Sequence, residues 1–349
     1  MSSSASQSQS KSISVQAIVF AEILLAVFAL LFFLLFSVPD PGKARPDWYS
    51  YGASAFEVVA YFSAALLCFR NWSSPQIVSG RRVWLSIGLG MLCYGIGTIL
   101  FTFWETYMGR EADVSPGDFF YIPTYLFLGW GMIMAFSDRR LNLDLWQWFT
   151  VGGIAAVSIA FATWLTLTPS PKSSALLFFG EPVIAQTAPA KPSPKATASP
   201  TIRPSAAAKP SPVVTPKPVA IEEKQLVEQK KQDAPEWVAT IESTLAPLKP
   251  FLDYFYVLAD VFILIIATTL LLAFWGGRFS QSWRMIAAAA FSLYIADMWF
   301  KYATTRLENY QSGGIIEIFW VFSGVLFGIG AALEYDLSRS RRGNSRRRA

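Results

Sequence analysis

The sequence contains no histidine and only two cysteines, and both shortages narrow its chemistry. Histidine is the commonest metal ligand and the usual side chain that titrates near neutral pH. Histidine-ligated zinc, bis-histidine haem and a Ser-His-Asp triad are therefore excluded. Cys68 and Cys93 both fall in long apolar runs, where free thiols behave as small apolar groups. The sequence predicts neither a disulfide framework nor a cysteine-metal cluster.

Charged residues are also scarce, at 15% of 349 residues, whereas 53% are hydrophobic and 15% aromatic. This composition is too apolar for a soluble protein of this length. No Walker or dinucleotide-binding motif is present, and we expect no cofactor. The net charge of +5 includes six arginines in the last eleven residues. That pattern favours a cytoplasmic tail at anionic lipid, and we expect no nucleic-acid partner.

Long apolar runs divide the chain, and most are close to the roughly 20 residues that a helix needs to cross a bilayer. We therefore predict an all-α, polytopic helical membrane protein with about eight transmembrane helices. The first five fall within residues 13–167 and the last three within residues 248–336. Their expected positions are residues 13–38, 54–69, 83–104, 115–136, 145–167, 251–275, 283–302 and 314–335.

Three acidic residues follow patterns that are typical of helix starts. Ser115 and Asp118 have the spacing of an N-cap and an N3 acid, with a proline between them. Ser54 and Glu57 have the same spacing, and Glu317 opens the last apolar run. Acids in a first helical turn complement the helix dipole. We interpret Glu57, Asp118 and Glu317 mainly as caps near the membrane surface.

The remaining segments are polar. Residues 1–12 are rich in Ser and Gln and are predicted to be disordered. Residues 168–247 are dominated by Ala, Pro, Ser, Thr and Lys, which predicts an extended linker. Residues 337–349 form a basic tail. Apolar residues at helical spacing near the end of the linker predict a short amphipathic helix at the membrane surface: Trp237, Ile241, Leu245 and Leu248.

The distribution of Lys and Arg predicts the orientation of the helices. One side collects 14 of these residues in the termini and short loops, and the other side collects five. The positive-inside rule therefore predicts that both termini are cytoplasmic and that the linker lies outside. We expect the protein in a bacterial cytoplasmic membrane or another internal membrane, with the lipid bilayer as its first partner.

The chain also indicates an internal duplication. Residues from about 54 to 140 match residues 248–336, so a three-helix unit occurs twice in the same direction. Parallel repeats occur in transporters, where a site lies between the halves, and also where duplication serves only packing. The matched pairs are Tyr94 with Tyr294, Gly97 with Asp297, Asp118 with Glu317, Gly129 with Gly328, and Gly131 with Gly330.

Three motifs carry a resemblance to a known class of domain: SPGDFFYIPTYLFLGWG, YIADMWFKY and NYQSGGIIEIFWVFSG. With these motifs the chain resembles the multi-pass membrane domains that precede diguanylate cyclase or kinase modules in many bacteria. The resemblance covers the two repeats and implies a sensory role. No GGDEF or kinase sequence follows residue 336. We therefore expect any signalling to need a membrane protein partner.

Two further acids fall deeper in their predicted helices, where ionisable groups are costly and mark functional sites by default. Asp260 and Asp297 each lie about two or more turns inside. Lys301 follows Asp297 by four residues, so we expect an ion pair on one helix face. A solute or proton site is the alternative.

All five acids fall in the half of the membrane that the orientation places outside. If the repeats face one another, these acids and nearby aromatic residues form a pocket suited to a cation, because ring faces also attract positive charge. The candidate pocket residues are Glu57, Asp118, Asp260, Asp297, Lys301, Glu317, Trp104, Tyr121, Trp299 and Trp320.

The sequence favours a non-enzymatic sensory or scaffold component of a membrane complex. The alternative is a secondary transporter that uses Asp260 or Asp297 to couple to a cation. An enzyme ranks last, because no nucleophile is paired with a base. We expect no metal site.

Overall fold

The computed structural model describes residues 14–39, 45–110, 114–137, 143–167, 235–274, 280–307 and 310–346. Their regular structure is helical throughout, as the long apolar runs predicted. The long helices are α1 (Val15–Phe36), α2 (Asp47–Ser73), α3 (Arg81–Thr102), α4 (Asp118–Ser137), α5 (Leu145–Leu167), α9 (Lys249–Ala273), α10 (Ser280–Arg306) and α11 (Ile318–Arg346). The predicted disorder of residues 1–12 and most of the predicted linker fall outside the described residues.

Six segments are long and apolar enough to cross a membrane, which makes the chain a helical membrane protein. They are α1, α2, α3 with its continuation to Tyr107, α5 to Leu165, the segment Glu236–Ala273, and the segment Ile315–Ser340. Helices α4 and α10 are 20 and 27 residues long and pack among these segments.

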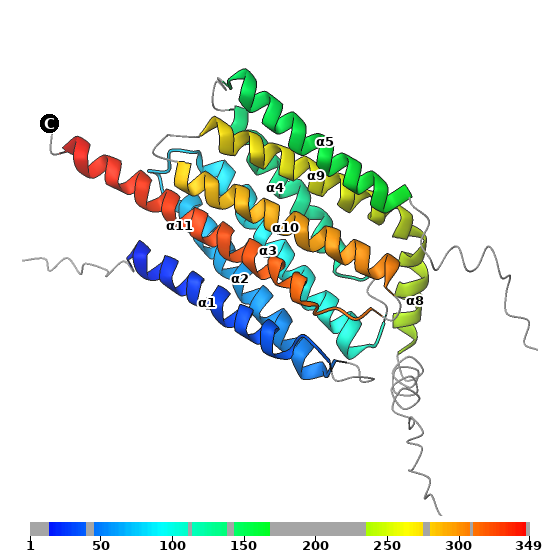
Figure 1. Cartoon of the computed structure of the whole chain (residues 1–349). Coiled ribbons are helices and arrows are strands. Elements are labelled where there is room, and N and C mark those ends of the chain that lie inside the picture. The colour runs from blue at the N-terminus through cyan, green and yellow to red at the C-terminus, as the bar shows by residue number, and fades with distance from the viewer. Residues whose placement is uncertain are drawn as a thin grey trace, which may run out of the picture.

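Six helices form a closed ring. Helix α2 packs on α3, α3 on α4, α4 on α9, α9 on α10, α10 on α11, and α11 packs back on α2. Helix α1 lies outside this ring against α2 and α11, and α5 lies outside it against α9 and α10 (Figure 1). The ring therefore joins α2–α4 to α9–α11, although α5 and the linker separate them in the sequence.

The two ends of the ring differ in chemistry. At the core end, where α3 and α10 begin, side chains from all six ring helices fill the interior. Trp84 and Trp283 lie there, exposed by only 0% and 1%, beside Leu128, Met132 and Phe327. At the acidic end, where α4 and α11 begin, carboxyl groups collect instead. Burial of large side chains fills the core end, and the cavity described below lies at the acidic end.

Helix bounds agree closely with the predictions for α1 and α5, and they differ most for α2 and α11. Helix α2 begins at Asp47, so the predicted start at Ser54 and Glu57 is wrong. Pro46 precedes the helix and Asp47 lies in its first turn, and both are favoured at a helix start. The residues between Asp47 and Ser54 then simply continue the helix. Helix α11 runs on to Arg346, eleven residues beyond the expected end of the span.

The amphipathic helix predicted at the end of the linker is present as α8 (Glu236–Leu245). It lies across the acidic end of the bundle, and a single 3-10 turn (Ala246–Leu248) joins it to α9 (Figure 1). Val238 and Leu245 are buried, whereas Trp237 is exposed. Arg110 of the loop before α4 forms an ion pair with Glu242 of α8 at 2.7 Å, which ties α8 to the bundle.

Candidate functional site

A cavity of about 150 Å³ lies inside the ring at the acidic end. All six ring helices line it, together with a π-helical turn (Phe103–Tyr107) that follows α3 and a 3-10 turn (Ile315–Glu317) that precedes α11. Seven carboxyl groups line the cavity: Glu57, Glu105, Asp118, Asp253, Asp260, Asp297 and Glu317. So many carboxyl groups in a low-dielectric interior cannot all be charged unless cations compensate them.

Eight of the ten predicted pocket residues line this cavity. They are Glu57, Asp118, Tyr121, Asp260, Asp297, Lys301, Glu317 and Trp320. The other two, Trp104 and Trp299, are not among the lining residues. Trp104 is buried in the π-helical turn, and Trp299 lies near Gly314 with its indole N–H buried. The predicted clustering of acids and aromatic rings is therefore present for most of the set.

Asp118 and Glu317 cap helix starts, as predicted. The Oδ2 atom of Asp118 accepts a hydrogen bond from the Ser115 backbone N–H at 2.8 Å. The carboxylate of Glu317 accepts from the backbone N–H groups of Gly313 and Gly314, at 2.7 and 3.2 Å. Asp118 also accepts a hydrogen bond from the Tyr256 hydroxyl of α9, so its carboxylate joins two helices at the cavity wall.

Glu57 does not cap a helix. It lies ten residues into α2 and accepts a hydrogen bond from the Thr98 hydroxyl of α3 at 2.8 Å. The neighbouring Ser54 likewise pairs with Thr102 at 2.7 Å. Both polar side chains therefore connect α2 to α3 within the ring, which a local capping pattern does not reveal.

Asp297 receives hydrogen bonds from two other helices. Its Oδ2 accepts from the Tyr125 hydroxyl of α4 at 2.5 Å, and its Oδ1 accepts from the Trp320 indole N–H of α11 at 2.7 Å. Asp260 lies beside it on α9 and is only 2% exposed. The Oδ2 atom of Asp260 has no hydrogen-bond partner. The deepest part of the cavity therefore holds one fully paired carboxylate next to one that is not.

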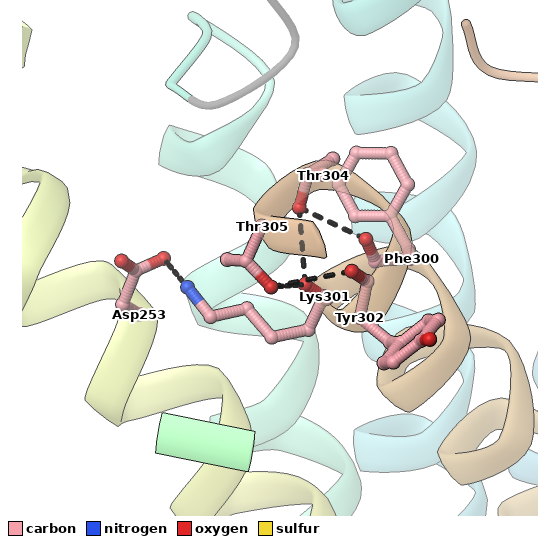
Figure 2. A network of polar contacts seen from close by, with 6 residues as sticks. All are labelled: Asp253, Phe300, Lys301, Tyr302, Thr304 and Thr305. Atoms are coloured by element: carbon pink, nitrogen blue, oxygen red, sulfur yellow. Dashed lines mark hydrogen bonds and ion pairs between the residues drawn. The ribbon is translucent and has the colours of Figure 1, made fainter. Parts of the chain in front are cut away.

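The predicted ion pair between Asp297 and Lys301 is wrong. Lys301 instead extends across to α9, where its ammonium forms an ion pair with Asp253 (Figure 2). Asp297 is already occupied by Tyr125 and Trp320, whereas Asp253 lies closer to the surface, with 34% of its side chain exposed. A flexible lysine keeps its charge near water when it can. The tertiary partner therefore displaced the partner on the same helix.

The loop before α11 is hydrogen-bonded to residues at the start of α2. Arg45 donates from its guanidinium to the carbonyls of Gln311 and Ser312, and the Tyr49 hydroxyl donates to the Gly313 carbonyl at 2.8 Å. Gly313 has a φ of 101°, and an added Cβ would lie 2.7 Å from Tyr49. Only glycine suits this backbone conformation and this close approach. The loop therefore holds Ser312 and Gly313 in the cavity wall.

Sequence reasoning missed several lining residues. Glu105 lies on the π-helical turn after α3, and such turns often mark functional positions. Asp253 sits in the second turn of α9, where an acid looks like a surface residue. Tyr125 and Tyr256 fall inside apolar runs, and local spacing does not single them out. The hydroxyl groups of buried tyrosines need partners, and that requirement was the one available signal.

No family model, curated protein or solved structure matches the chain. Among the described residues, no group of three or more Cys, Asp or Glu side chains is placed to hold a metal ion. Cys68 and Cys93 are free thiols. The fold and the site together define a class: a helical membrane protein with an acid-lined cavity inside a ring of six helices.

Proposed function

We propose that the ring arose by duplication of a three-helix unit, α2–α4 and α9–α11, within a protein of eight transmembrane helices. The ring order supports this, because each unit supplies three consecutive members and the two joints, α4 with α9 and α11 with α2, are equivalent. Exchange of the two units leaves the order of the ring unchanged. Helices α1 and α5 each precede one unit and pack against its first helix, α1 against α2 and α5 against α9.

Packing contacts support the same duplication. An added Cβ at Gly131 would lie 3.0 Å from Ile87 and 3.2 Å from the Val83 carbonyl. An added Cβ at Gly330 would lie 2.9 Å from Ile286 and 3.2 Å from the Ser282 carbonyl. Each residue of the first set precedes its counterpart by 199 positions. The buried Trp84 and Trp283 have the same separation.

Polar contacts at the acidic end repeat with this separation too. The Tyr121 hydroxyl reaches Thr98 at 3.4 Å, and the Trp320 indole N–H reaches Asp297 at 2.7 Å. Asp118 and Glu317 each accept a hydrogen bond from the backbone N–H three residues earlier. These pairs favour a single offset of 199, so Thr98 rather than Gly97 is the counterpart of Asp297.

The protein is proposed to be a sensory component of a membrane complex that binds a solute in this cavity. With the orientation expected from Lys and Arg, the acidic end faces the outside and both termini are cytoplasmic. The observation that carries the proposal is the cavity itself, which combines seven carboxyl groups with a packed core beneath it. In this proposal a solute enters from the acidic end and does not pass through the packed core. Such one-sided access suits a protein that detects a solute rather than transports it.

The cytoplasmic side supplies the contacts through which such a component acts on others. Helix α11 lines the cavity at Trp320 and continues to Arg346, so one rigid element links the site to the arginine-rich segment. We expect that segment to bind anionic lipid or an acidic membrane protein partner. The resemblance to sensor domains of signalling proteins agrees with this arrangement.

A secondary transporter is the second candidate. The observation that favours it is buried Asp260 beside Asp297, which is hydrogen-bonded to Tyr125 of the first unit. Coupling sites of transporters occur between repeats. Transport would require the core end, with Trp84 and Trp283, to open. The packed core therefore makes this the weaker candidate.

Two experiments distinguish the candidates: crosslinking in native membranes, and solute uptake by proteoliposomes. The sensory role predicts one stoichiometric membrane partner and no solute uptake by proteoliposomes that contain the purified chain. The transporter predicts uptake that disappears in Asp297→Asn. Uptake without any partner would overturn the sensory role. A partner that is retained when the arginine-rich segment is replaced by serines would overturn the contact assigned to that segment.

A further inference from the structure

Among the carboxyl groups that line the described cavity, Asp260 has a buried oxygen without a donor. It is 98% buried, and its Oδ2 has no hydrogen-bond partner. Asp297 has donors on both oxygens, and Glu57 accepts from Thr98. An unpaired buried carboxylate oxygen costs free energy unless a proton or a ligand donor satisfies it. Asp297 and Tyr125 are neighbours of Asp260, so a proton shared with Asp297 or an N–H donor of a ligand satisfies the Asp260 oxygen.

The walls around this point are aromatic. Tyr94, Tyr121, Tyr125, Phe300 and Trp320 all line the cavity. Ring faces attract cations, and aromatic walls suit an organic body better than a hydrated ion. The described residues contain no three-carboxylate cluster placed for metal binding. The geometry thus favours an organic cation over a metal ion.

Lys301 shows which kind of cation the cavity accommodates. It is the only basic residue among those that line the described cavity, and its ammonium is paired with Asp253. Figure 2 shows the side chain extended away from α10 toward Asp253 of α9. A primary ammonium therefore already occupies the shallow part of the cavity. The deep part, with Asp260 and Asp297, has carboxylates but no cation from the lining.

We infer that the solute is a small primary ammonium ion with a single charge, bound with its N–H groups on Asp260 and its body against the aromatic walls. The inference rests on the proposed solute-binding function and deepens it. A primary ammonium brings three N–H donors, which a quaternary ammonium lacks. Charge-assisted hydrogen bonds to a desolvated carboxylate are the strong ones. Lys301 excludes a second charge by occupying Asp253.

Isothermal titration calorimetry of the purified full chain in detergent tests the inference. The probes are n-butylammonium, tetramethylammonium, sodium and magnesium chlorides at matched ionic strength. We expect n-butylammonium to bind and Asp260→Asn to weaken it by about tenfold or more. The matched control is Asp144→Asn, because Asp144 is exposed at the start of α5, away from the cavity. Tetramethylammonium should bind more weakly than n-butylammonium.

A second variant keeps the test decisive if Asp260→Asn does not fold. Lys301→Met removes the resident ammonium and frees Asp253, so 1,4-diaminobutane should then bind more tightly than n-butylammonium. In the unaltered chain the order should be the reverse. Tighter binding of magnesium or tetramethylammonium would overturn the ammonium inference and leave a solute-binding role intact. No binding of any probe, with Lys301→Met also inert, would overturn both.

Discussion

Asp297 joins three of the ring helices through one carboxylate. Tyr125 from α4 and Trp320 from α11 donate to its two oxygens, while the residue itself belongs to α10. Hydrogen bonds to a charged acceptor in a low-dielectric interior are stronger than neutral ones, and removing one partner leaves the other unsatisfied. The stability of the acidic end therefore depends on these two donors.

Loss of either donor should be measurable. We predict that Tyr125→Phe and Trp320→Phe each lower the free energy of unfolding by about 1–3 kcal/mol, because each leaves one oxygen of Asp297 without its donor. Unfolding of the purified protein in detergent, followed by circular dichroism, gives the values. Tyr51→Phe is the matched control, since Tyr51 is 43% exposed and should change little.

The double variant sharpens this test. Because both donors bind the same carboxylate, Tyr125→Phe and Trp320→Phe should not be additive, and the deviation should exceed about 0.5 kcal/mol. If Tyr125→Phe costs no more than Tyr51→Phe, the hydrogen bond between Tyr125 and Asp297 does not contribute to stability. Strict additivity would mean that the two donors act independently.

The acids were visible in the sequence, but their partners were not. Local spacing was sufficient for Asp118 and Glu317, because a cap bonds to backbone within its own turn. It failed for Lys301 and Glu57, whose partners lie on other helices. A pattern within one helix predicts which side chains can meet, and tertiary packing decides which ones do.

At the scale of the helix, small residues set how closely α3 meets α4 and α10 meets α11. Gly131 and Gly330 each face a backbone carbonyl and an isoleucine of the neighbouring helix. Small residues at such positions let helix backbones approach closely in membranes. If the duplication is real, the two positions should respond alike to the same change.

We predict that Gly131→Ala and Gly330→Ala each destabilise the protein by about 1–3 kcal/mol relative to Gly152→Ala, measured by the same unfolding assay. Alanine favours a helix over glycine by about 1 kcal/mol, and that gain applies at all three positions. Gly152 in α5 has no heavy atom within 4 Å of an added Cβ, so Gly152→Ala measures only the change in helix propensity. Equal stabilities for all three variants would refute close packing at the two glycines.

Helix starts were predicted where a cap is local and missed where the helix simply continues. The apolar runs fixed α1 and α5 within about two residues, as expected when a hydrophobic segment matches the bilayer. For α2 the sequence held two possible starts, at Asp47 and at Ser54. The structure uses the earlier one, and the later serine became an interhelical partner of Thr102.

For the whole molecule, the apolar helices were predictable but the ring was not. Hydropathy and charge predict spans and orientation, because each span meets the same solvent. The neighbour of a helix depends on packing between residues far apart in the sequence, such as Asn71 of α2 and the Ala331 carbonyl of α11 at 2.8 Å. The cavity exists only because the ring closes, so its missed members Glu105 and Asp253 required the complete structure.

The proposed orientation predicts that the two ends of the helix bundle are accessible from opposite sides of the membrane. Glu236 of α8 is exposed at the acidic end, and Ser340 is exposed near the opposite end of α11. In a background with Cys68 and Cys93 replaced by alanine, a membrane-impermeant maleimide applied to intact cells should label Glu236→Cys but not Ser340→Cys. Permeabilised cells should show both. Eight crossings with cytoplasmic termini place these two residues on opposite faces of the membrane. Labelling of both residues from outside would therefore contradict the proposed parallel orientation of the two three-helix units. The proposed access of the acidic cavity from outside would then have no support.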